Sequence, residues 1–139
     1  MNCEELIRQL EDCSLPATAL DHRAHVQAGF GYLQRHGYAG ALSGMASALR
    51  RFAAHHGKAG LYHETITAAF LALIHERMAA DLVEDGNVIE LTAARGLDWE
   101  SFAARHPDLF THDLLAQYYT KETLRSDLAR NCFVLPKAG

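Results

Sequence analysis

The chain has little of what a disulfide framework, a membrane span or a nucleic-acid interface requires. Three cysteines occur among 139 residues, and their odd number and lack of C-x-x-C spacing indicate neither disulfides nor a thiolate zinc site. No apolar run reaches the roughly 18 to 20 residues that span a bilayer. Thirteen Lys and Arg against seventeen Asp and Glu give a formal charge of -4, without the basic surface that duplex nucleic acid requires. We therefore expect neither nucleic acid nor a membrane as a partner.

What the chain does have is the size and composition of one globular domain. About half of its residues are apolar (49%), which is enough for a core of its own. The start, Met1 to Glu5, is acidic where a secretory signal would be basic, so we expect a cytoplasmic protein. No repeat, low-complexity tract or linker divides the sequence. We therefore treat residues 1–139 as a single helical domain.

Hydrophobic spacing predicts one helix after another and no paired strands. Asn2 followed by Glu5 resembles a capping box at the start of a short first helix. Apolar stripes, caps and glycine or proline stops place the later helices at about 18–36, 39–56, 61–83, 99–105 and 111–119, with final turns from Thr120 or Ser126. Gly57 and the polar loop at 84–87 end two of these helices, and Asp98 caps another. Residues 88–91 resemble a lone strand, which we interpret as helical or irregular because it has no partner. The expected fold is an all-α, single-domain bundle of about five to seven helices.

Nine histidines are the most informative feature of the sequence. His22 and His25 lie in the first turns of the helix at 18–36, His56 ends the next helix, and His63 lies near the start of the one after. If consecutive helices run antiparallel, these three helix ends are neighbours. His22, His56 and His63 also extend the apolar stripes of their helices. The spacing therefore predicts a pocket lined by imidazoles at one end of the bundle.

Clustered imidazoles are typical of metal and proton-transfer sites. His22 and His25 are three residues apart on one helix, so their Cβ atoms are about 5 to 6 Å apart. With His63 they would bind a divalent transition metal such as zinc, nickel or iron and leave a coordination position open. Glu64 would then move the proton in a metal-dependent hydrolase or lyase reaction on a small-molecule substrate. His56 is a reserve ligand, and Asp21 is a candidate partner of His25.

A second hypothesis makes the same residues structural. Histidines near helix ends often hydrogen-bond backbone carbonyls, and a first-turn carboxylate such as Glu64 is favoured by the helix dipole. The H-E-x-x-H motif of zinc proteases is incomplete because Thr67 replaces its second histidine. The glycines between 29 and 44 do not form a phosphate loop and favour close helix packing. The protein would then be a non-catalytic interaction or small-ligand-binding module. The sequence does not indicate its oligomeric state.

Four segments carry a resemblance that covers the chain from about Cys13 onward. They are Asp21–Val26 (DHRAHV), Gly60–Thr67 (GLYHETIT), His106–Leu109 (HPDL) and Phe133–Pro136 (FVLP). Together they resemble a family of small, His-rich bacterial helical proteins to which no activity is assigned. The H-R-x-H-V and Y-H-E-T-I-T segments imply that His22, His25, His63 and Glu64 belong together. The architecture is also loosely similar to the metal-dependent helical-bundle hydrolases related to the DNA-damage-inducible proteins, which hold an ion with three histidines.

Overall fold

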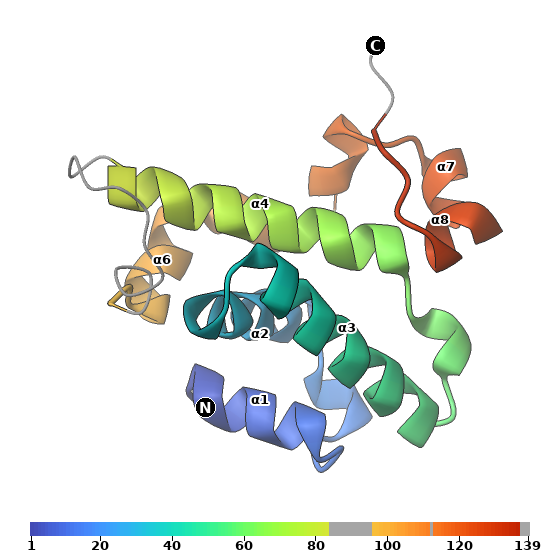
Figure 1. The fold of residues 1–139 in the computed structure, drawn as a ribbon, viewed down its shortest axis with the longest axis horizontal. Coiled ribbons are helices and arrows are strands. Elements are labelled where there is room, and N and C mark those ends of the chain that lie inside the picture. Colours follow the sequence, from blue (N-terminus) through green and yellow to red (C-terminus); the bar gives the residue numbers. More distant parts are fainter. Residues whose placement is uncertain (84–95, 112, 137–139) are drawn as a thin grey trace.

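The computed structural model describes residues 1–83, 96–111 and 113–136. These residues form helices and no strand, which confirms the all-α bundle (Figure 1). The α-helices are α1 (Cys3–Glu11), α2 (His22–Arg35), α3 (Tyr38–His55), α4 (Glu64–Val83), α6 (Trp99–Arg105), α7 (Lys121–Arg125) and α8 (Asp127–Asn131). Short 3₁₀ helices lie at Ala17–Ala19, Ala59–Leu61, Pro107–Phe110 and Leu114–Gln117.

Helix α2 is the centre of the bundle, in contact with α1, α3 and α4. Its Phe30 is completely buried. Two glycines on α2 allow its neighbours to approach closely: a Cβ at Gly29 would lie 2.9 Å from Ile74 Cδ1 on α4, and one at Gly31 would lie 2.7 Å from Ile7 Cδ1 on α1. The expectation that these glycines serve helix packing is confirmed.

The predicted starts of the second and fourth helices, at 18 and 61, are wrong because side-chain caps fix both helices further along the chain. The Asp21 Oδ1 atom accepts a hydrogen bond from the Ala24 N–H at 2.8 Å, so α2 begins at His22. His63 Nδ1 accepts from the Ile66 N–H at 3.1 Å, so α4 begins at Glu64. The apolar spacing continued through the preceding 3₁₀ segments, and spacing alone does not distinguish a cap from a helical turn.

Helix α3 ends as the sequence predicts, at a left-handed glycine. Gly57 has a φ of 70°, and its N–H donates to Ala54 O at 3.1 Å while the Lys58 N–H donates to Ala53 O at 2.7 Å. This pair of bonds is the Schellman motif, which satisfies the last carbonyls of a helix. The turn brings His56 and Lys58 to the same end of the bundle as the start of α4.

The C-terminal third consists of short elements, and its prediction was correct only in part. Asp98 caps α6, and Thr120 and Ser126 both act as caps, of α7 and α8. The helix expected at 111–119 is replaced by the 3₁₀ helix Leu114–Gln117, because the Thr111 hydroxyl donates to Asp108 O and does not cap. The predicted loop at 84–87 and the apolar segment at 88–91 lie outside the described residues.

The end of the described chain lies against the start of α4, where Figure 1 shows α7 and α8. The Thr65 side chain, completely buried, donates to Cys132 O at 2.8 Å and accepts from the Val134 N–H at 3.1 Å. The Tyr119 hydroxyl donates to Val134 O at 2.7 Å. These bonds fix the C-terminal segment beside the helix end that carries His63.

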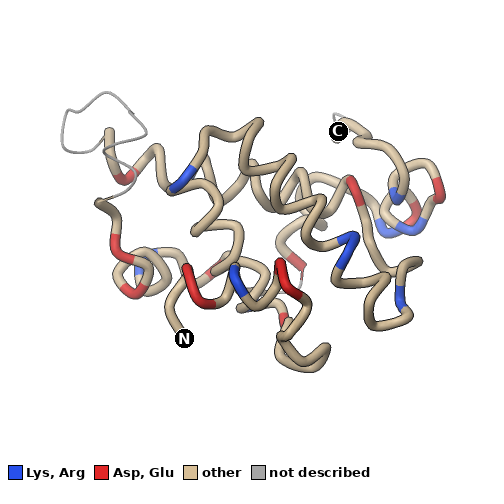
Figure 2. The backbone as a smooth tube through the Cα atoms, turned by 60° about the horizontal axis from the view of Figure 1, so that its bottom comes forward, with Lys and Arg blue, Asp and Glu red and all other residues tan. Residues whose placement is uncertain are grey.

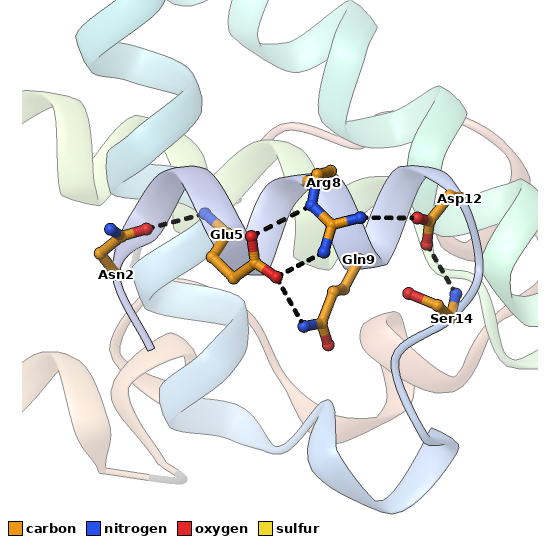
Figure 3. Close-up of polar contacts among 6 residues, drawn as sticks. All are labelled: Asn2, Glu5, Arg8, Gln9, Asp12 and Ser14. Atoms are coloured by element: carbon orange, nitrogen blue, oxygen red, sulfur yellow. Dashed lines mark hydrogen bonds and ion pairs between the residues drawn. The ribbon is translucent and has the colours of Figure 1, made fainter.

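Most charged side chains of the described residues lie on the outside of this framework, and the Asp81 side chain, which is 8% exposed and pairs with His106, is an exception. On α1, Asn2 Oδ1 accepts from the Glu5 N–H, while the Glu5 carboxylate bonds to Arg8 and Gln9 (Figure 3). Only one arm of the expected capping box is therefore present. Basic residues are dispersed over several elements and alternate with acidic ones (Figure 2). Across the described ranges, no helix has the length and apolar character that a membrane crossing requires.

Candidate functional site

The first turns of α2, the last turns of α3 and the first turns of α4 enclose a cavity of about 460 Å³. His22, His25, His56 and His63 all line it, in the arrangement that the helical spacing predicts. Most of the wall is apolar, and its larger members include Val26, Met45, Leu49, Phe52, Ile66 and Phe70. Among the residues that the structure describes, no Asp or Glu lines the cavity.

His63 is held in a structural position by both of its ring nitrogens. Nε2 donates to Leu124 O at 2.6 Å, and Nδ1 accepts from the Ile66 N–H at 3.1 Å. These two bonds define the neutral ring with its proton on Nε2, because Nδ1 must keep its lone pair to act as the cap. The side chain is buried, with 9% exposure. His63 therefore caps α4 and joins it to the end of α7.

His22 has a similar connecting role at the other side of the cavity. Its Nε2 donates to Leu109 O at 2.9 Å, in the 3₁₀ helix Pro107–Phe110. Its ring meets the Phe70 ring edge to face, with centroids 5.1 Å apart. Two of the cavity histidines thus hold C-terminal segments against the α2–α3–α4 core.

His25 lies one helical turn further along α2. Its Nδ1 donates to Asp21 O at 2.9 Å. Burial lowers the pKa of His25 below its ordinary value, the nearby His22 lowers it further, and the bond to the Asp21 carbonyl opposes the shift. Folding therefore favours the neutral form of the His25 imidazole more than the unfolded chain does.

The lowered pKa of His25 predicts that the protein loses stability in mild acid. As pH falls below about 6.5, the unfolded chain takes up a proton at this histidine that the folded chain does not. The free energy of unfolding should therefore decrease between about pH 7.5 and about pH 5, and His25→Gln should reduce that decrease. Urea denaturation at both pH values measures the free energy of unfolding of the wild type and of His25→Gln. The variant His55→Gln, at an exposed histidine, is the matched control. An equal pH dependence in the wild type and His25→Gln would contradict the assignment.

His56 is the fourth histidine of the cavity lining. Its Nε2 is buried and has no hydrogen-bond partner within the described part of the chain. The ring contacts Phe52 and His55 edge to face, with centroids 4.5 and 5.0 Å away. Leaving a buried donor or acceptor unsatisfied costs about 1 to 3 kcal/mol.

Glu64, the predicted proton-transfer residue, is engaged beside the cavity and is not among the residues that line it. Its carboxylate accepts from Arg50 Nη2 at 2.9 Å and from the Tyr62 hydroxyl at 2.8 Å. Burial, with the hydrogen bond to Glu64, raises the pKa of Tyr62 to about 12. Arg50 also lies over the Tyr62 ring, 4.7 Å from its centroid. The three side chains form a closed polar cluster at the start of α4.

The arrangement is not a formed metal centre. Within the described ranges, no group of three or more His, Cys, Asp or Glu could hold a metal ion. Ligation by His63 would require breaking its bond to Leu124 O or to the Ile66 N–H. His22 and His25 line the same cavity, so the predicted ligands are neighbours whose ring nitrogens serve the fold. Metal binding stays a prediction.

Three contributors to the site were not predicted from the sequence. Lys58 and Tyr62 line the cavity, and so does an apolar wall from α3 that includes Met45 and Leu49. The sequence does carry a signal for the apolar wall, because the apolar stripe of α3 predicts the buried face of that helix. That this face borders a cavity is not encoded in the local spacing. Comparisons of the chain with protein-family models, curated proteins and solved structures gave no match.

Proposed function

We propose that the protein binds a small, mostly apolar organic molecule in the cavity between α2, α3 and α4. The observation that carries the proposal is the cavity itself, whose volume of about 460 Å³ lies within the range of about 300 to 1,000 Å³ typical of small-molecule sites. An apolar wall with a few polar groups is also typical of such sites. Lys58, Tyr62 and Thr67 are residues of the lining that carry polar side chains.

The roles of the histidines support binding more than chemistry. His22 and His63 use ring nitrogens to hold backbone carbonyls, and Glu64 is neutralised by Arg50. The two histidines fixed in this way form part of a preformed wall, which lowers the entropic cost of ordering the site when a ligand binds. This is the small-ligand-binding alternative derived from the sequence.

A neutral apolar dye tests the proposal without assuming the natural ligand. Phenylnaphthylamine should bind with one equivalent per chain and gain fluorescence, because the cavity removes it from water. Exposed leucines outside the cavity offer a competing site, so Leu128→Ser, at a residue 66% exposed, serves as the control and should leave dye affinity unchanged. Absence of saturable binding, or loss of binding in Leu128→Ser, would overturn the proposal.

The metal-dependent hydrolase or lyase is a second candidate, supported by the position of His22, His25 and His63 on one cavity. It requires about one equivalent of zinc, nickel or iron in the purified protein. Elemental analysis of the wild type and of the His22→Ala/His63→Ala double variant measures this content. Glu64→Gln should then retain metal and lose about 10²- to 10⁴-fold in turnover, the usual contribution of a positioned base. Metal-free wild-type protein would reject this candidate.

A further inference from the structure

Most side-chain hydrogen-bond donors of the cavity wall are already in use. The Tyr62 hydroxyl donates to Glu64 Oε1 at 2.8 Å, and the Thr67 hydroxyl donates to His63 O at 2.8 Å. The ring N–H groups of His22 and His63 donate to backbone carbonyls. A ligand that carries only acceptors would find none of these protons free, and burying an acceptor without a donor is costly.

Two residues of the lining, Lys58 and His56, have side-chain donors outside this set. Lys58 is exposed, so its ammonium group is open to solvent at the mouth of the cavity. The Nε2 atom of His56 has almost no accessible surface, so a proton there is out of reach of a ligand. Neither residue therefore provides a buried donor at a known position in the wall.

His25 offers the opposite capacity, an open acceptor. Its Nδ1 donates to Asp21 O at 2.9 Å, so the neutral ring carries its lone pair on Nε2, across the ring from this bond. That atom has no hydrogen-bond partner in the described part of the chain and, unlike Nε2 of His56, it retains accessible surface. His25 lines the cavity, and burial lowers its pKa, which favours this neutral form. The wall therefore has an acceptor that still lacks a proton.

We infer that the ligand is a neutral alcohol whose apolar body fills the cavity and whose hydroxyl donates to Nε2 of His25. This inference rests on the proposed function, because it names the chemical class of the molecule that the cavity binds. An alcohol brings its own proton to the lone pair of His25. A ketone or ester of the same shape brings only acceptors, so that lone pair would stay unpaired. A site that hydrogen-bonds a hydroxyl discriminates against an analogue that lacks it.

Displacement of bound phenylnaphthylamine by 2-octanol and by 2-octanone tests the alcohol claim. The two probes share a carbon skeleton and differ only in the oxygen group, which is a donor in the alcohol and solely an acceptor in the ketone. The wild type should bind 2-octanol about 10-fold more tightly than 2-octanone. These two affinities decide the inference even if a variant of His25 does not fold.

A variant of His25 locates the hydrogen bond. His25→Phe keeps an aromatic ring in the wall and removes Nε2, so it should weaken 2-octanol binding by about 10-fold and leave the affinity for 2-octanone unchanged. His55→Phe makes the same change at an exposed imidazole that does not line the cavity. This matched control should keep both affinities at their wild-type values.

The outcomes are distinguishable. If the dye does not bind, the proposed function fails before the ligand class is tested. If the dye binds and 2-octanone displaces it as well as 2-octanol does, or if neither displaces it, the alcohol inference is overturned while the binding function stands. A folded His25→Phe variant that keeps the preference for 2-octanol would also overturn it, as would an equal loss of 2-octanol affinity in His55→Phe.

Discussion

Filling the cavity from α3 is expected to abolish ligand binding without unfolding the protein. Ala53 lines the cavity two residues before the end of α3. In Ala53→Trp the indole would occupy the space that a ligand needs, so the affinity for phenylnaphthylamine should fall by about 100-fold or more, equivalent to about 3 kcal/mol. Equilibrium titration by fluorescence measures the loss, and circular dichroism checks that the helices remain.

The adjacent residue provides a matched control for this variant. Ala54 is exposed on the same helix, so Ala54→Trp adds the same side chain outside the cavity. Its dye affinity should equal that of the wild type. If Ala53→Trp binds the dye as tightly as Ala54→Trp does, the dye does not occupy the cavity, and the binding function proposed for it is wrong.

Replacing His63 with alanine is expected to cause the largest loss of stability among the cavity histidines. The change removes the cap of α4, a loss of about 1 kcal/mol, and leaves the Leu124 carbonyl without its donor, a loss of about 1 to 2 kcal/mol. The free energy of unfolding should therefore decrease by about 2 to 3 kcal/mol, measured by urea denaturation. His63→Asn retains a capping oxygen and should recover about 1 kcal/mol.

Two controls separate this structural role from metal binding. His55→Ala removes an exposed imidazole and should change stability by less than about 0.5 kcal/mol. A chelator should leave the wild type as stable as before, because the hydrogen bonds of His63 require no ion. A loss of stability in His63→Ala no larger than in His55→Ala would contradict the structural role. Destabilisation of the wild type by the chelator to the level of His63→Ala would indicate a metal site.

The sequence predicts those features of the fold that depend on neighbouring residues. The apolar stripes of α2, α3 and α4 place the histidines at a common end, and Gly57 and Asp98 end and begin helices as expected. Each of these features follows from residues within a turn or two of one another.

Features that depend on distant partners could not be predicted in the same way. His63 bonds to the carbonyl of Leu124, and His22 to that of Leu109, both far along the chain. Helical spacing predicts that an imidazole lies at a pocket, but it does not predict which backbone group its nitrogens will bond to. For that reason the sequence supports a metal ligand and a structural histidine equally, and only the tertiary contacts of each ring distinguish them.

A methyl NMR titration with phenylnaphthylamine tests the central claim most directly, because it locates the bound molecule. If the cavity is the binding site, the largest shift changes should occur at methyl groups of its wall, on Leu49, Leu71 and Ile74, and should saturate at one equivalent. The methyl groups of Leu128 and Leu135, both exposed on the C-terminal segment, should change little. If the largest shift changes occur instead at the methyl groups of Leu128 and Leu135, and those of the cavity wall do not change, the account is contradicted.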